Sequence, residues 1–267
     1  MKFNRKKHLK RIARKGGLAR IKSHGNPGTP IGRKLGGLKS VAIQRKVKNS
    51  PFAPSLVIFP EHSTRLAEFI GILLGDGSIT ARQVVITLHK VDDKKYANYT
   101  ARLAAKLFSL EVRPKERKKT NVNIVVLSRT LIVRFLNSMG LETGSKIRNQ
   151  TGVPDWIKNN TGYRKMCLRG LFDTDGCFYV DKHVIKDKTY ENAGMNFTNR
   201  SIPLLNFFKT TLDEMGFLPT QSSKYSITLR KEADIVRYFR EIGSSNPKHS
   251  DKFKSYQYKK GRVPKRS

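Results

Sequence analysis

Acidic residues are scarce in this 267-residue chain, and its first 60 residues contain none. The whole chain has 54 Lys and Arg against 20 Asp and Glu, a formal net charge of +34, and residues 1–50 hold 16 of the basic residues. Such an excess of positive charge repels itself unless a polyanion neutralises it. A nucleic acid is therefore the first partner to consider.

Long apolar runs and cysteine motifs are also lacking. The chain has no run of about 18 apolar residues, the length needed to cross a membrane. Its basic segments also have no matching apolar face, so no membrane attachment is expected. The two cysteines, Cys167 and Cys177, lack C-x-x-C spacing, which argues against a zinc site or a disulfide framework. The N-terminus has no apolar segment of a secretory signal. We expect an intracellular protein that works with DNA, in a prokaryotic cytoplasm or an organelle.

A basic N-terminal arm is predicted over residues 1–50. The segment RKGGLA is echoed later by KLGGLK, with HGNPGTP between the two. These glycines and prolines cannot pack a core, so we expect an arm that follows a phosphate backbone; a solubilising tail is the alternative. A basic tail, residues 257–267, would extend the DNA contact at the other end of the chain.

From residue 51 onward the composition becomes globular and the sequence repeats itself. Asp76 and Asp175 end similar segments, and IVRFLNSMG (residues 132–140) is matched by IVRYFREIG (residues 235–243). Between these landmarks, each half is predicted to contain a helix, two strands, a helix, two strands and a helix. The first half spans residues 51–150 and the second residues 151–256, with the joint at TGVPDWI.

An apolar helix precedes the aspartate of each half. The segments are FIGILLGDG (residues 69–77) and LRGLFDTDG (residues 168–176). Apolar residues recur at helical spacing in the first, and Gly71 and Gly75 share one face of that helix. The second has small residues at the same two positions. Helices with small residues on facing sides can approach closely, so we expect these two to pack side by side.

A pseudo-two-fold relation between the halves would make Asp76 and Asp175 neighbours at one end of that helix pair. The helix C-termini and the neighbouring carboxylate both disfavour negative charge there, so one group must bind a proton or a cation must join them. Oxygen ligands with room for water and phosphate suit Mg²⁺, with Mn²⁺ as a substitute. The alternative is that both segments only end helices. Their duplication in phase with the repeat favours metal-assisted phosphodiester hydrolysis instead.

The paired segments, Phe69–Gly77 and Leu168–Gly176, resemble the two motifs of single-chain LAGLIDADG homing endonucleases. The resemblance covers residues 60–256, and the family's metal-binding acid, eighth in the motif, maps to Asp76 and Asp175. It implies an α+β fold of two pseudo-symmetric αββαββα halves. Each half would carry a curved antiparallel sheet, and the halves would pack through the two motif helices. The first copy has Leu74 at the sixth position, where the second has an aspartate.

The resemblance also implies further catalytic residues. A lysine after the third helix of each half maps to Lys146 and Lys248, with Lys252 as a substitute for the latter. A cation there would neutralise charge that develops on the phosphate. The water-positioning place at the end of the second strand maps to His89 and Asn199.

In the resembled family the two sheets enter the major groove of DNA. The segments SITARQ, RPKERKKTN, YVDKHVIKDK and QSSKYS supply polar strands and turns for this purpose. We expect DNA contacts from Arg82, Gln83, Arg113, Arg117, Lys182 and Lys224.

The predicted function is a site-specific, Mg²⁺-dependent homing endonuclease. A monomer would make a double-strand break in a long asymmetric target, leaving 5′-phosphate and 3′-hydroxyl ends. An intron RNA maturase and a non-cleaving DNA-binding regulator on the same scaffold are the alternatives, because a basic surface suits RNA as well as DNA. A regulator would have no use for both aspartates, so their presence favours the nuclease. The Met start favours an intron-encoded or free-standing protein.

Overall fold

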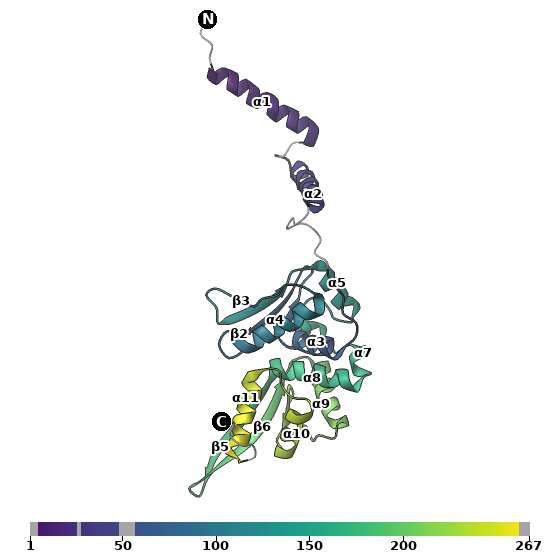
Figure 1. Cartoon of the computed structure of the whole chain (residues 1–267). Coiled ribbons are helices and arrows are strands. Elements are labelled where there is room, and N and C mark those ends of the chain that lie inside the picture. The colour runs from purple at the N-terminus through teal and green to yellow at the C-terminus, as the bar shows by residue number, and fades with distance from the viewer. Residues whose placement is uncertain (1–4, 26–27, 48–56, 262–267) are drawn as a thin grey trace. The chain divides into compact units, whose positions relative to one another are not determined.

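The computed structural model describes residues 5–25, 28–47 and 57–261 (Figure 1). The chain divides into two compact units, Met1–Leu56 and Val57–Ser267. The first unit contains two helices, α1 (Arg5–His24) and α2 (Pro30–Lys46), which the glycines and prolines of this region did not predict. Thr29 caps α2 by accepting a hydrogen bond from the Gly32 amide (3.0 Å), and Pro30 suits the first turn because it needs no amide partner there.

The second unit consists of two halves with the same order of elements, as the repeat predicted. The first half contains α3 (Thr64–Asp76), β1 (Gly77–Ile79), β2 (Val84–His89), α4 (Lys94–Phe108), β3 (Lys115–Glu116), β4 (Val122–Leu127) and α5 (Thr130–Ser138). The second half contains α8 (Thr161–Asp175), β5 (Gly176–Ile185), β6 (Lys188–Thr198), α9 (Ile202–Glu214), β7 (Thr220–Ser223), β8 (Ser226–Leu229) and α10 (Glu232–Glu241). This confirms the α+β class and the αββαββα pattern.

Within residues 57–261, three helices lie outside the repeat. The short α6 (Lys146–Asn149) and α7 (Asp155–Lys158) connect the halves, and α11 (Pro247–Lys259) follows the second half. The helix α11 packs against β5, and Tyr256 is buried in the core. It runs to Lys259 and so extends into the segment 257–267 that was predicted as a basic tail, because its apolar side still has a sheet to cover.

Each half contains one four-stranded antiparallel sheet, with the strand orders β1-β2-β4-β3 and β5-β6-β8-β7. The first strand starts directly after the motif aspartate in both: Gly77 pairs with Ile86, and Gly176 pairs with Phe197. This shared register places the two aspartates at equivalent points of the two sheets.

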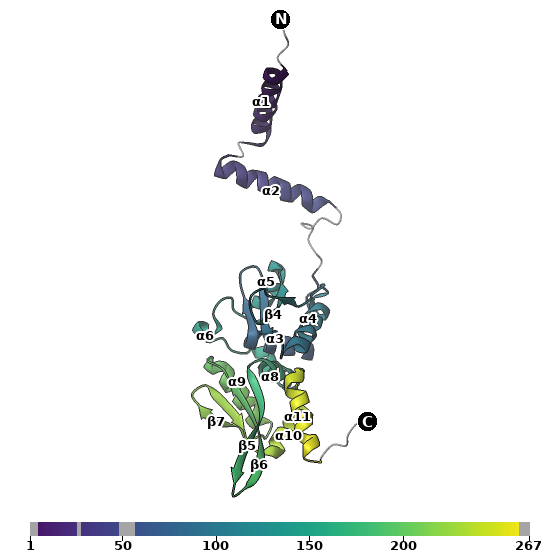
Figure 2. The same cartoon turned by 90° about the vertical axis from the view of Figure 1, so that its left-hand side faces the viewer.

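Helices cover one face of each sheet. Along β2, Val84, Ile86 and Leu88 are buried while Thr87 between them is exposed, the alternation of a strand with one face in the core. The helix α4 packs on β2 and β4, and in the second half α9 packs on β8 and α10 on β6. On its other face β2 carries Val85, Thr87 and His89, which are half-buried or exposed; Figure 2 shows β4 of the same sheet beside α4.

The two motif helices, α3 and α8, lie side by side at the border between the halves (Figure 1). Ser63 starts α3 by accepting a hydrogen bond from the Leu66 amide (3.2 Å). A Cβ atom on Gly71 would overlap the backbone of Cys167, and one on Gly170 would lie 2.8 Å from the Ile72 amide nitrogen. The expectation of closely packed helices with small residues at the contact is therefore confirmed.

None of the helices described is long and apolar enough to cross a membrane.

Candidate functional site

The two aspartates lie where α3 and α8 end together. Burial, followed by the negative charge of Asp175, raises the pKa of Asp76 to about 7. Burial also raises the pKa of Asp175, against the opposing effects of the Lys146 charge and a hydrogen bond from Asn199. Two partly desolvated carboxyl groups that repel each other form a place where a cation is favoured.

Lys146 lies at the same point. As the first residue of α6, it directs its ammonium group to the last carbonyls of α3, with Nζ 2.9 Å from the Leu74 oxygen and in contact with the Gly75 oxygen. This contact satisfies carbonyl groups that a helix end leaves unpaired. Burial lowers the pKa of Lys146, while Asp175 and Asp76 counteract that effect.

Asn199 belongs to this group as well. Its side-chain amide donates a 2.8 Å hydrogen bond to Asp175 Oδ2, and its carbonyl oxygen accepts one from the Ser201 amide (2.8 Å). Asn199 is thereby held in one orientation beside the carboxylate. The structure thus brings together four of the predicted site residues: Asp76, Asp175, Lys146 and Asn199.

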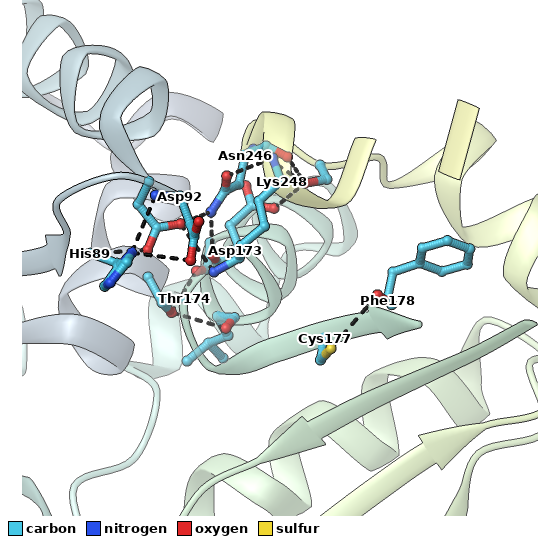
Figure 3. Close-up of polar contacts among 12 residues, drawn as sticks. His89, Asp92, Asp173, Thr174, Cys177, Phe178, Asn246 and Lys248 are labelled. Carbon is cyan, nitrogen blue, oxygen red and sulfur yellow. Dashed lines mark hydrogen bonds and ion pairs between the residues drawn. The ribbon is translucent and has the colours of Figure 1, made fainter. Parts of the chain in front are cut away.

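His89 points to other partners. Its Nδ1 lies 3.1 Å from an Asp92 carboxylate oxygen, and its Nε2 lies 3.3 Å from the Asn121 amide (Figure 3). The sheet registers make Leu88, rather than His89, the counterpart of Asn199, because Ile86 and Phe197 occupy equivalent positions. The sequence-based prediction therefore matched Asn199 to a residue one position too far along β2. In a strand, a shift of one residue turns the side chain to the opposite face.

Lys248 forms an ion pair across the border between the halves. Its Nζ lies 3.0 Å from Asp93 Oδ1, and Asp93 precedes α4 of the first half. Burial opposes ionisation of Asp93, but hydrogen bonds from Asn246 and Lys248 outweigh it and lower its pKa. Lys252, the suggested substitute, lies farther along α11.

Sequence reasoning missed a polar network beside the aspartates. Glu68 of α3, which is 2% exposed, pairs with Arg169 of α8 and accepts hydrogen bonds from Tyr99 (2.7 Å) and Ser245 (2.7 Å). Burial raises the pKa of Asp173 to about 7, although hydrogen bonds from Ser244 and Ser245 counteract it. The sequence did contain a signal for this network, because Glu68, Arg169 and Asp173 are charged residues within the two helices that carry the apolar motifs.

The arrangement fits a divalent cation held mainly by non-protein oxygen atoms. Within the described ranges, no three His, Cys, Asp or Glu side chains gather in a way that could hold a metal. Asp76 and Asp175 would therefore supply two oxygen ligands, with water and phosphate for the remainder, as Mg²⁺ prefers. A resident metal with a full protein ligand set does not fit this part of the chain.

Most of the predicted DNA-contacting residues lie in strand-connecting turns. Arg82 and Gln83 lie between β1 and β2, Arg117 follows β3, Lys224 lies between β7 and β8, and Lys182 lies on β5, where it pairs with Glu191 (3.0 Å). Arg113 differs from the others. It lines a cavity of about 580 Å³ beside α4, together with Lys95, Arg102 and Ser245, so it lies with the helices rather than with these turns.

Comparisons with known proteins agree with this geometry. A family model described as a LAGLIDADG-like domain matches residues 162–243. The tRNA-splicing ligase RtcB of Methanopyrus kandleri is 26% identical over 208 residues, which is 67% of this chain and 20% of that protein. The chain thus spans about a fifth of the length of this curated relative.

A solved structure of I-SmaMI shares the fold, and one of I-DmoI is a weaker match. I-SmaMI bound to an uncleaved DNA target in the presence of calcium ions superposes with a TM-score of 0.50 at 12% identity, over 76% of this chain and 95% of that one. Mesophilic variants of the homing endonuclease I-DmoI match at a TM-score of 0.45 and 16% identity, over 68% of this chain and 96% of theirs. The described body of the chain, residues 57–261, therefore shares the fold of I-SmaMI, and its residues 162–243 match the LAGLIDADG-like family model.

Proposed function

We propose that this chain is a site-specific DNA endonuclease that hydrolyses one phosphodiester bond in each strand of a long asymmetric target. The observation that carries the proposal is the pair of half-buried carboxyl groups, Asp76 and Asp175, which repel each other at the border between the two antiparallel sheets. Elevated pKa values in a pair of facing acids are typical of functional sites. The two halves differ in sequence, so they would read two different half-sites.

Asp76 and Asp175 would hold Mg²⁺, or Mn²⁺ in its place. When bound, the metal would supply an activated water and stabilise the leaving 3′ oxygen. Asn199 orients Asp175 through its 2.8 Å hydrogen bond. Lys146 places a positive charge beside both carboxylates, where it would stabilise the charge that develops on the phosphate. The products would carry 5′-phosphate and 3′-hydroxyl ends.

The turn residues Arg82, Gln83, Arg117 and Lys224, together with Lys182, would contact the DNA from the open sheet faces. The basic helices α1 and α2 would bind phosphate groups outside the core target. Each such phosphate contact steepens the log–log dependence of binding on salt by roughly 0.9. Because both halves are present in one chain, we propose that the monomer acts on DNA without a second copy.

An intron RNA maturase is the second proposed function. The cavity beside α4 is lined by three basic residues, Lys95, Arg102 and Arg113, of which Arg113 also pairs with Glu111 (2.7 Å). A second basic surface would bind intron RNA, while the sheets would bind DNA. A non-cleaving regulator is less well supported, since it would not need two aspartates.

The test incubates the purified chain and Mg²⁺ with a plasmid library of random inserts, then captures and sequences the cut ends. We expect a long asymmetric consensus with 3′ overhangs, lost in Asp175→Asn. Cutting that survives Asp175→Asn would refute the assignment of the aspartates. Tight, salt-sensitive binding without cutting would instead favour the regulator or the maturase. An intron-splicing assay would then distinguish the two, because only the maturase would promote splicing.

A further inference from the structure

The loops before α6 and α11 hold equivalent helix ends in different ways. Leu74 and Asp173 are both sixth in their motifs. The Leu74 carbonyl accepts a hydrogen bond from Lys146 Nζ (2.9 Å), and the Asp173 carbonyl accepts one from Asn246 Nδ2 (3.0 Å). In the second half, the neutral amide of Asn246 therefore makes the contact that the Lys146 ammonium group makes in the first half. Lys248 makes a different contact.

Asp93 binds Lys248 and fixes the surrounding loop. Besides the 3.0 Å ion pair, Asp93 accepts hydrogen bonds from Asn246 Nδ2 (2.9 Å) and from the His89 amide (3.2 Å). Figure 3 shows Asn246 and Lys248 gathered beside Asp173, near His89 and Asp92. The Asp93 side chain is 8% exposed and that of Lys248 is 35% exposed, so water screens this pair only in part.

The two aspartates of the site consequently have unequal surroundings. The Lys146 charge acts on both, and Asp175 also accepts a hydrogen bond from Asn199. Asp76 also lies in the field of Asp93, whose negative charge opposes that of Lys248. No side-chain hydrogen bond to Asp76 comes from the residues between 57 and 261 that the structure describes.

We propose that Asp93 is a positioning residue that neutralises Lys248, so that the DNA strand whose scissile phosphate lies beside Lys248 is cut more slowly than the strand beside Lys146. This inference rests on the nuclease function proposed above. A cation that is already paired with a carboxylate stabilises developing phosphate charge less than one that donates only to backbone carbonyls. A nicked intermediate would then accumulate before the double-strand break.

The experiment uses the full chain and the target recovered from the library, with a different fluorophore on the 5′ end of each strand. Single-turnover cleavage in Mg²⁺ measures both strand rates at once. We expect the wild-type rates to differ by a factor on the order of ten, which corresponds to about 1.4 kcal/mol in barrier height. Asp93→Asn should accelerate only the slower strand, and Lys146→Met should slow only the faster strand.

Asp213→Asn is the matched control, because it removes an acid from an exposed pair with Lys209 (2.7 Å) on α9. It should leave the strand ratio unchanged. A change in folding would affect both strands alike, so the ratio separates a local effect of Asp93 from a structural one. Lys248→Met should affect the slower strand strongly in the Asp93→Asn background and weakly in the wild type.

A second readout needs no cleavage. Unfolding temperatures of Asp93→Asn, Lys248→Met and the double variant should be non-additive if the pair forms in solution. Equal strand rates in the wild type, or equal slowing of both strands by Asp93→Asn, would overturn the proposal while leaving the nuclease intact. Absence of cleavage in the wild type, with non-additive unfolding preserved, would refute the nuclease function and the strand asymmetry together.

Discussion

Replacing Gly71 with alanine would test the close contact between α3 and α8, on which the position of both aspartates depends. The added Cβ atom would lie 3.0 Å from the Cys167 carbonyl carbon, 3.1 Å from its Cα, and closer still to its carbonyl oxygen. All three are backbone atoms of a buried helix, so no side chain can rotate away. The helices would have to separate, and that disturbs packing along the whole border.

Two opposing effects set the magnitude. Alanine in a helix interior is favoured over glycine by about 1 kcal/mol. Overpacking against a fixed neighbour costs about 3 kcal/mol at the upper end of its usual range. The net destabilisation is then about 2 kcal/mol, which lowers the unfolding temperature of a domain of this size by roughly 4–8 °C.

The assay is thermal unfolding followed by circular dichroism, with Gly36→Ala as the control. Gly36 also lies inside a helix, but its Cβ would meet nothing within 4 Å, so only the gain in helix propensity applies. We expect Gly36→Ala to leave the main transition unchanged. An unfolding temperature of Gly71→Ala at or above that of the wild type would refute the packing argument.

Three further predictions concern the charged groups. Glu68→Gln would leave Arg169 without its carboxylate partner and should destabilise the fold by about 3 kcal/mol, as measured by urea unfolding; if Glu68→Gln and Arg169→Gln lowered stability additively, the ion pair would make no net contribution. With a folded-state pKa of about 7 against an unfolded value of 3.8, Asp76 binds more protons when folded, so metal-free stability should fall as pH rises from about 4 through 7. Mg²⁺ should then raise the unfolding temperature more at pH 8 than at pH 6, since it binds the carboxylate form, and an equal shift at both pH values would contradict this. Lys146→Met should slow cleavage of the faster strand on the order of a hundredfold while DNA affinity stays within a few fold, and a parallel loss of affinity would assign Lys146 to binding instead.

The repeat and its two aspartates could be predicted from sequence because they rest on local pattern. A helix of apolar residues, a small residue every fourth position and an acid after the last turn are all contained within nine residues. Two copies in phase then imply that Asp76 and Asp175 meet, and the half-buried pair at the joined ends of α3 and α8 agrees with that expectation. The register of both sheets follows from where these helices end.

Only the tertiary structure decided which polar groups surround the pair, because those contacts join residues far apart in the chain. Ser245 reaches Glu68 across 177 positions, and Asn246 reaches Asp93 across 153. The family resemblance made Lys146 and Lys248 look equivalent, yet the fold gives one of them backbone carbonyls and the other a carboxylate. A shift of one or two residues in a loop or strand costs little locally, and it changes which side chain reaches the site.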